Sequence, residues 1–417
     1  MDHSETPLLD ALADYHSLGR YGFTPPAHRQ GRGVDKRVID VLGREPFRDD
    51  VLASNGLDDR RSSGRFLARA EELMADAVGA SDAFFSTCGS SLSVKAAMLA
   101  VAGGRGDLLL GRDSHKSVVA GLVFAGVQPR WIPPQWDEER HLSHPPSPEQ
   151  VAAAWRDYPD AAGALIVSPS PYGTCADLTG IAEVCHERGK PLIVDEAWGA
   201  HLPFHDQLPT WAMDAGADVC VVSVHKMGAG FEQGSVFHVQ GDLVDRQRLS
   251  KCADLLMTTS PNVLVYAAMD GWRRQMVEFG NGLLGAALDL AAKTREAIDE
   301  IPDVEVLDAE LLRRAGIPRP RSTAGPDRRV GYGMLWLPGG RLAARTHATR
   351  LGPVRSPSSP GDLVHRRRRR ECRAFGRRVV ALARVGRRTR ATTGHSSAVA
   401  KSARTRDRHG PARRILR

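Results

Sequence analysis

Short apolar runs alternate with segments of helical periodicity along the first two thirds of the chain. Between two such runs, Asp177–Lys190 places Ile181, Val184 and Cys185 on one face with charged residues opposite, which predicts a crossover helix. Strand and helix in alternation predict an α/β fold with a doubly wound, mostly parallel sheet. The predicted strands are Asp82–Ser86, Asp107–Leu110, Val127–Ile132, Ala164–Ser168, Leu192–Asp195 and Val219–Ser223.

Two of these runs end in residues that are too polar for a core. Asp195 closes one strand, and Ser223, His225 and Lys226 follow the next. Ligands of open parallel sheets bind beyond the carboxyl ends of the strands. We therefore expect Asp195 and Lys226 to face one ligand, although a single Asp or Lys is most often a surface charge.

A lysine and a carboxylate at adjacent strand ends match the needs of pyridoxal 5'-phosphate. The aldehyde of this cofactor binds covalently to a lysine, and an acidic partner keeps its ring nitrogen protonated. The pair Lys226 and Asp195 is thus a candidate cofactor site.

The turn Ser86–Ser93 is a candidate phosphate site. Gly89 allows a tight turn, and Ser90 and Ser91 offer hydroxyls and amides at the start of a helix predicted through Val94–Val101. Serine is also a common helix cap without any ligand, so this motif has weight only beside the others.

Two histidines lie close to predicted strand ends. His115 could stack on a planar ring, and His225, together with Ser223, could reach a phosphate. A surface position for His115 and a half-buried structural position for His225 are the alternatives.

Charge divides the chain into an acidic body and a basic tail. The whole chain has 57 Lys and Arg against 49 Asp and Glu, but residues 313–417 alone hold 28 Arg and one Lys against four acids. The remaining residues therefore carry 28 basic and 45 acidic groups. An acidic body mildly favours a cationic substrate.

The tail has two interpretations. We favour a change of reading frame between about Leu311 and Gly340, after which the residues have no evolved function; Gly331–Gly340 holds the last plausible strand. The alternative is a genuine basic arm that binds nucleic acid. Both interpretations predict a disordered tail.

Other features narrow the class of protein. No apolar stretch is long enough to span a membrane, and the N-terminus lacks the pattern of a signal peptide. The six cysteines show no metal-binding spacing and are expected to be reduced. A cytoplasmic location without a membrane partner is the expectation.

Eight motifs, in order, resemble the Orn/Lys/Arg decarboxylases, which are fold type I pyridoxal-phosphate enzymes with the aspartate-aminotransferase fold. The resemblance covers about residues 20–280, in a short form with an aberrant C-terminus. The motifs are FTPPAHRQGRG (from Phe23), LDD (from Leu57), FFSTCGSS, DSHKS, SPSPYGTCADL, VDEAWGAH, SVHKMGAGFEQGS and TTSPN (from Thr258).

The resemblance implies a role for each matching residue. Lys226 would bind the cofactor aldehyde, Asp195 would partner the ring nitrogen, and His115 and Ala197 would contact the two ring faces. The phosphate would be bound by Ser90, Ser91, Ser223 and His225, and Thr259 or Ser260 would reach the phosphate in a neighbouring subunit.

The same resemblance implies an organisation and an activity. The expected parts are an N-terminal segment (1–60), a large cofactor-binding domain (61–285), the start of a small C-terminal domain (286–335) and the Arg-rich tail (336–417). The expected reaction is decarboxylation of lysine, ornithine or arginine by at least a homodimer, with nucleic acid not an expected partner.

Two other functions stay open at this point. The cofactor site alone does not choose which bond is broken, so an aminotransferase or a carbon–carbon lyase is possible within the same chemistry. An inactive remnant whose basic tail binds nucleic acid is the third hypothesis.

Overall fold

The structure is a computed structural model that describes residues 1–55, 57, 65–138, 140–300, 305–306, 335–337 and 341–342. The LDD motif lies partly outside these residues. So does the predicted tail, apart from its first residues. Within the predicted Gly331–Gly340 segment the structure has a strand, β11 (Leu335–Leu337), which pairs with β10 (Glu305–Val306) and β12 (Arg341–Leu342).

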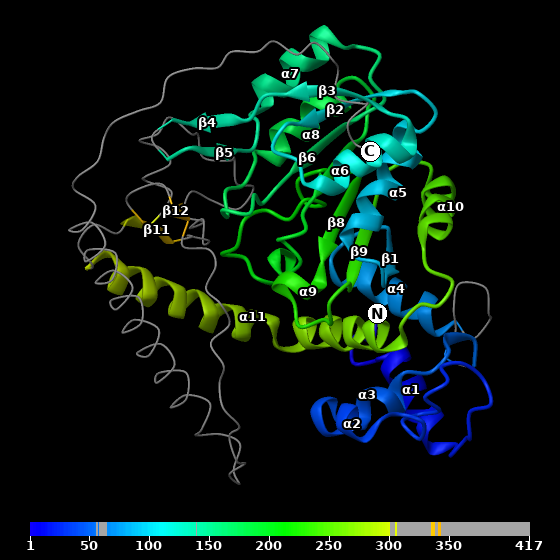
Figure 1. Cartoon of the computed structure of the whole chain (residues 1–417). Coiled ribbons are helices and arrows are strands. Elements are labelled where there is room, and N and C mark those ends of the chain that lie inside the picture. Colours follow the sequence, from blue (N-terminus) through cyan, green and yellow to red (C-terminus); the bar gives the residue numbers. More distant parts are fainter. Residues whose placement is uncertain are drawn as a thin grey trace, which may run out of the picture. The chain divides into compact units, whose positions relative to one another are not determined.

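A seven-stranded sheet forms the centre of the described region, in the order β1-β9-β8-β7-β6-β2-β3 (Figure 1). Adjacent strands of this sheet are parallel, except that β9 is antiparallel to both β1 and β8. A separate hairpin consists of β4 and β5. The bounds are β1 (Asp82–Ser86), β2 (Asp107–Gly111), β3 (Gln128–Ile132), β4 (Gln135–Asp137), β5 (Leu142–His144), β6 (Ala164–Val167), β7 (Leu192–Asp195), β8 (Val219–Ser223) and β9 (Ser235–Val239).

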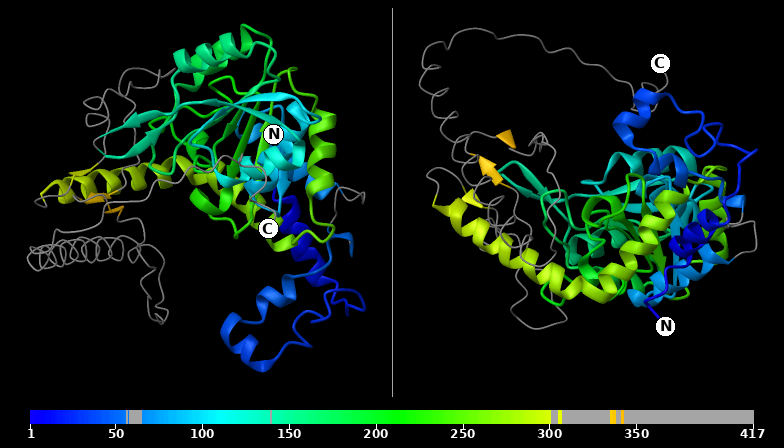
Figure 2. Two further views of the ribbon diagram at one scale, coloured as in Figure 1. Left: turned by 45° about the horizontal axis from the view of Figure 1, so that its top comes forward. Right: turned by 90° about the horizontal axis from the view of Figure 1, so that it is seen from below.

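Helices cover both faces of the sheet (Figure 2). The α-helices are α1 (Pro7–Ser17), α2 (Lys36–Leu42), α3 (Glu45–Asp49), α4 (Phe66–Ala77), α5 (Ser90–Ala102), α6 (Lys116–Ala125), α7 (Pro148–Asp157), α8 (Leu178–His186), α9 (Val224–Met227), α10 (Arg246–Leu256) and α11 (Val263–Asp299). Two 3₁₀ turns are η1 (Ala53–Asn55) and η2 (Leu202–Phe204).

The predicted doubly wound α/β sheet is confirmed, because consecutive residues of the inner strands enter different cores. Leu108 and Leu110 of β2 pack in the cluster that includes residues of α5, α6 and α10, whereas Leu109 packs with residues of α4, α7, α8 and α11. Burial on both sides explains why these strands read as continuous apolar runs rather than alternating ones.

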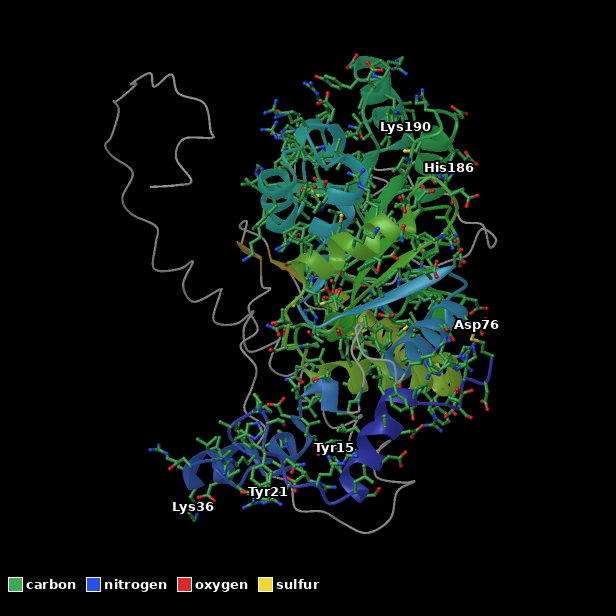
Figure 3. All side chains as sticks on the ribbon, turned by 90° about the vertical axis from the view of Figure 1, so that its right-hand side faces the viewer. Tyr15, Tyr21, Lys36, Asp76, His186 and Lys190 are labelled. Atoms are coloured by element: carbon green, nitrogen blue, oxygen red, sulfur yellow. The ribbon has the colours of Figure 1, made fainter. Side chains whose placement is uncertain are left out.

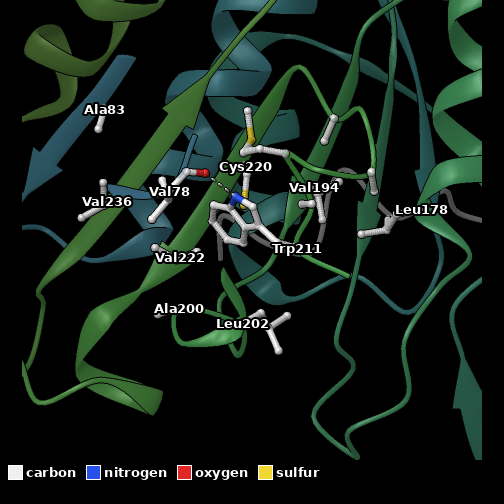
Figure 4. Close-up of a cluster of buried hydrophobic side chains, with 14 of the residues drawn as sticks. Val78, Ala83, Leu178, Val194, Ala200, Leu202, Trp211, Cys220, Val222 and Val236 are labelled. Carbon is white, nitrogen blue, oxygen red and sulfur yellow. Dashed lines mark hydrogen bonds between the residues drawn. The ribbon is translucent and has the colours of Figure 1, made fainter. Parts of the chain in front are cut away.

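Trp211 packs within the core cluster that contains Leu109. Its side chain is among the largest that are fully buried, and its indole N–H donates to the carbonyl oxygen of Val78 over 3.2 Å (Figure 4). A buried indole needs such an acceptor, so this bond joins the 211 loop to the end of α4.

The N-terminal segment is attached to the body through α11. The buried carboxylate of Asp270 accepts from the backbone N–H of Leu8 over 2.9 Å and pairs with the buried guanidinium of Arg273, also over 2.9 Å. Arg273 donates in turn to the backbone carbonyls of His3 and Glu5. Farther along, α2 has no buried residue, and Figure 3 shows Lys36 beyond Tyr15 and Tyr21 on this segment.

Helix α11 is continuous for 37 residues. It therefore runs through position 285, the predicted end of the cofactor-binding domain. Asn262 caps its first turn, because the side-chain oxygen accepts from the N–H groups of Leu264 and Val265.

None of the helices in the described part of the chain has the length and apolar character needed to cross a membrane.

Replacing Asp270 with alanine should destabilise the protein strongly. Arg273 would be left as a buried cation without its carboxylate, which costs roughly 3–5 kcal/mol of the free energy of unfolding. Urea unfolding measures this loss. Asp82→Ala is the matched control, because it breaks an exposed pair with Arg246 and should cost about 1 kcal/mol or less. Equal losses in the two variants would contradict the anchoring role of Asp270.

Candidate functional site

Three buried serines meet where the carboxyl ends of β1 and β8 reach the beginning of β9. Ser235 lies opposite both Ser86 and Ser223 in the sheet, and all three are fully buried. The hydroxyl of Ser235 donates to the carbonyl of Val222 over 2.8 Å. The hydrogen-bonded serines make a small polar floor at this edge of an otherwise apolar sheet.

Lys226 lies in the short helix α9, which begins directly after β8. Its side chain is half-buried, and burial lowers the pKa of its amine, while the charge of Asp195 acts in the opposite direction. An amine with a lowered pKa is a better nucleophile near neutral pH, because more of it is unprotonated.

Asp195 is the last residue of β7 and is only 4% exposed. Burial raises its pKa, opposed first by the charge of Lys226, then by a hydrogen bond from the backbone N–H of Ala197 over 3.3 Å, and by His115. Within the described residues this carboxylate forms no ion pair. It is therefore a buried acid whose nearest cations act on it from a distance.

His115 caps helix α6 at the end of β2. Its Nδ1 accepts from the N–H of Ser117 over 3.2 Å, which leaves Nε2 to carry a proton. Although the residue is exposed overall, partial desolvation lowers its pKa; Asp195 opposes that shift and Lys226 adds to it. His115, Asp195 and Lys226 are thus close enough to influence one another, as expected from their strand ends.

The predicted phosphate turn lies beside the end of β8. Gly89 has a φ of 73°, a conformation that favours glycine, and Ser90 and Ser91 begin α5. The Ser223 hydroxyl donates to the Ser90 hydroxyl over 2.7 Å. The N–H of Gly89 donates to the carbonyl of Gln233 over 2.9 Å, which ties this turn to the loop that follows Lys226.

Three of the predicted positions lie differently from the rest. Nδ1 of His225 is 2.9 Å from the carbonyl oxygen of Gly234, and its Nε2 lies 3.7 Å from Glu232, so both of these contacts are within its own loop. Thr259 and Ser260 are exposed between α10 and α11. Their expected role concerns a neighbouring subunit and stays a prediction.

Ala197 is buried in the turn directly after Asp195, where the prediction puts it against one ring face. Sequence reasoning did not assign the next residue, Trp198. Its ring centroid lies 4.5 Å from the Nζ atom of Lys226. The VDEAWGAH motif could have indicated a role for Trp198, because a large apolar side chain next to the polar end of a strand seldom belongs to the core.

The sequence did not predict a role for Glu196, whose buried side chain supports the turn that follows Asp195. It is 1% exposed, and its Oε2 accepts from the N–H of Ala212 and the thiol of Cys220, both over 3.3 Å. Burial raises the pKa of its carboxyl well above the usual value. Glu196 therefore supports the turn beside the candidate functional acid Asp195, and its burial favours the protonated form.

This arrangement suits a ligand with three distinct groups. Lys226 can bind an aldehyde, Asp195 can stabilise a protonated ring nitrogen, and the hydroxyls and amides of the Ser90 turn can bind an anion. No cluster of three or more potential metal ligands occurs among the described residues.

The family model for the major domain of Orn/Lys/Arg decarboxylases matches residues 6–315 of this chain. The match includes every candidate site residue discussed above.

Two curated relatives are arginine decarboxylases of bacilli. The chain is 34% identical to the Bacillus subtilis protein over 312 residues, which are 75% of this chain and 64% of that protein. It is 33% identical to the Bacillus cereus protein, covering 75% of this chain and 68% of that protein. The chain thus spans about two thirds of the length of these relatives.

The fold is shared with a solved lysine decarboxylase. The structure of lysine decarboxylase A from Pseudomonas aeruginosa superposes with a TM-score of 0.63 at 24% identity, over 78% of this chain and 47% of that one. This likeness establishes the fold alone.

Replacing Glu196 with glutamine should make the protein less sensitive to alkaline pH. The folded-state pKa of Glu196 is raised, so the stability that this group contributes is fully present below its ordinary pKa of 4.5 and is lost as pH rises through the folded-state value. The amide stays neutral. Urea midpoints between pH 5 and 9 should therefore shift in favour of Glu196→Gln as pH rises.

The control for this series is Glu187→Gln, because that side chain is 73% exposed. Its difference from the parent protein should stay constant across the pH range. If Glu196→Gln behaves in the same way, burial does not raise the pKa of Glu196.

Proposed function

The chain belongs to the Orn/Lys/Arg decarboxylase family, and from this membership we propose that it uses pyridoxal 5'-phosphate to decarboxylate a basic amino acid. The observation that carries the proposal is the joint placement of Lys226, Asp195 and His115 beyond the carboxyl ends of β8, β7 and β2, at one edge of the sheet. Homologues with an established name are arginine and lysine decarboxylases, so a carboxy-lyase is favoured over an aminotransferase or a carbon–carbon lyase.

Pyridoxal phosphate fits the chemistry of the residues present. Lys226 would hold its aldehyde, Asp195 its ring nitrogen, and Ser90, Ser91 and Ser223 its phosphate. When bound, the cofactor supplies a ring that accepts the electrons left at the substrate's α-carbon after carbon dioxide departs.

Asp195 would keep the ring nitrogen protonated. Burial at 4% exposure excludes water, so the attraction between this carboxylate and a protonated nitrogen is stronger than it would be at the surface. The positive partner would in turn compensate the burial that raises the pKa of Asp195.

Lys226 and His115 would have two further roles, in proton transfer and in limiting the access of water. Lys226 would hold the cofactor aldehyde, and its Nζ could deliver a proton to the α-carbon of the substrate. His115 would lie over the ring and limit the access of water. Its Nδ1 is already engaged by Ser117, which orients the imidazole.

Arginine is the first substrate to test. The relatives at 33–34% identity are named arginine decarboxylases, whereas the lysine decarboxylases are 24–26% identical to this chain. We also propose at least a homodimer, in which Ser260 or Thr259 approaches the phosphate of the neighbouring subunit. The domain limits at 60, 285 and 335 and a cytoplasmic location remain predictions.

Lys226→Ala should abolish both cofactor attachment and catalysis. The full chain is purified with pyridoxal phosphate, the visible absorbance of the attached cofactor is recorded, and release of carbon dioxide is measured with arginine, lysine and ornithine. Because no other group in this arrangement can bind the aldehyde, the visible band should disappear, and turnover should fall by several orders of magnitude.

Lys251→Ala is the control, since Lys251 is exposed on α10, and it should keep the band and the activity. A band that persists in Lys226→Ala contradicts the assignment of Lys226. A normal band without carbon dioxide, but with transfer of the amino group to a keto acid, would instead identify an aminotransferase.

A further inference from the structure

We propose that Trp198 is a positioning residue for Lys226, and that its indole face holds the side-chain ammonium when the lysine is not covalently engaged. The inference deepens the proposed function, because it assigns a resting place to the amine that would bind the cofactor aldehyde. It gives Trp198 a role that packing alone does not explain.

The geometry of the pair is that of a cation–π interaction. The Nζ atom of Lys226 lies 4.5 Å from the ring centroid of Trp198, within the range in which an ammonium is attracted to the negative face of an indole. Within the described part of the chain, this amine has no hydrogen bond and no ion pair. The indole is therefore its direct partner, and the charge of Asp195 acts on it without an ion pair.

A tight turn places the indole. The N–H of Gly199 donates to the carbonyl of Glu196 over 2.7 Å, so residues 196–199 form a turn with Trp198 near its tip. A side chain at position 199 would collide with that of Glu196 and come within 2.9 Å of Leu202. The turn consequently accepts little besides glycine at this position.

The buried side chain of Glu196 anchors this turn in the core. Its two hydrogen bonds, from Ala212 and Cys220, connect the turn to the 211 loop and to β8. Lys226 follows the same strand β8. Glu196 thus connects the turn that carries the indole to the strand that precedes Lys226. This connection helps to keep the indole and the amine close to each other.

An aromatic partner suits a lysine that must react. A carboxylate in direct contact would stabilise the ammonium strongly and slow its deprotonation, whereas the ring attracts the cation without accepting its proton. The charged or titratable groups that face Lys226 are Asp195 from β7 and His115 from the start of α6. Trp198 therefore adds a modest, uncharged preference for the ammonium form and fixes where it lies.

The test measures the protonation of Lys226 in the full chain purified without added cofactor. Trace acetylation with acetic anhydride over a range of pH, read by mass spectrometry, reports the midpoint for each lysine, and the exposed Lys251 is the internal reference. Three variants are compared with the parent protein: Trp198→Phe keeps an aromatic face, Trp198→Leu keeps apolar bulk without one, and Asp195→Asn removes the charge of the carboxylate.

The expected result is a fall of the Lys226 midpoint by about half a unit to one unit in Trp198→Leu and a clearly smaller fall in Trp198→Phe. Such a shift corresponds to roughly a three- to tenfold increase in acetylation of Lys226 below its midpoint, with Lys251 unchanged. A purely structural role for the indole would not separate leucine from phenylalanine in a pH profile.

Other outcomes overturn the proposal. If Trp198→Leu leaves the midpoint in place while Asp195→Asn lowers it, the amine depends on the carboxylate and not on the indole. Equal shifts in the leucine and phenylalanine variants would mean that bulk, rather than the aromatic face, matters. Because neither cofactor nor carbon dioxide enters this measurement, it can succeed or fail independently of the decarboxylase assay.

Discussion

The site depends on a carboxylate kept at the end of a buried strand. Asp195 belongs to β7, which lies between β6 and β8 in the centre of the sheet, so its side chain is almost free of water. An ionised group in such a place is unfavourable unless positive charge lies near it. The end of the adjacent strand β8 supplies Lys226, and the end of β2 supplies His115. The parallel arrangement of the strands is what brings these groups to one edge.

Much of this could be predicted from the sequence because two physical signals were strong. Strands buried on both faces appear as apolar runs, so Asp82–Ser86, Leu192–Asp195 and Val219–Ser223 were predicted with the bounds that the structure has. The polar residues that end those runs could be placed at the ligand edge, since parallel strands share one carboxyl edge. The approach of Lys226 to Asp195 follows from these two rules alone.

Other features depended on contacts between distant residues and could not be read in this way. Strand β9 (Ser235–Val239) was not predicted, because Ser235 and His238 interrupt its apolar pattern, and only the pairing with β1 and β8 buries them. The placement of Trp198 over Lys226 requires the turn supported by Glu196, whose partners Ala212 and Cys220 are 16 and 24 residues away. Neither a period nor a spacing in the sequence contains that information.

The hydrogen bond between Ser223 and Ser90 lies within the proposed phosphate site, and it sets a condition for any ligand that binds there. The Ser223 hydroxyl donates to the Ser90 hydroxyl over 2.7 Å, so a molecule that separates them has to offer an acceptor to Ser223. Phosphate oxygens can do this with stronger, charge-assisted bonds, whereas apolar or cationic molecules would leave two hydroxyls unsatisfied. Under the proposed function, this pair would therefore favour a ligand rich in hydrogen-bond acceptors.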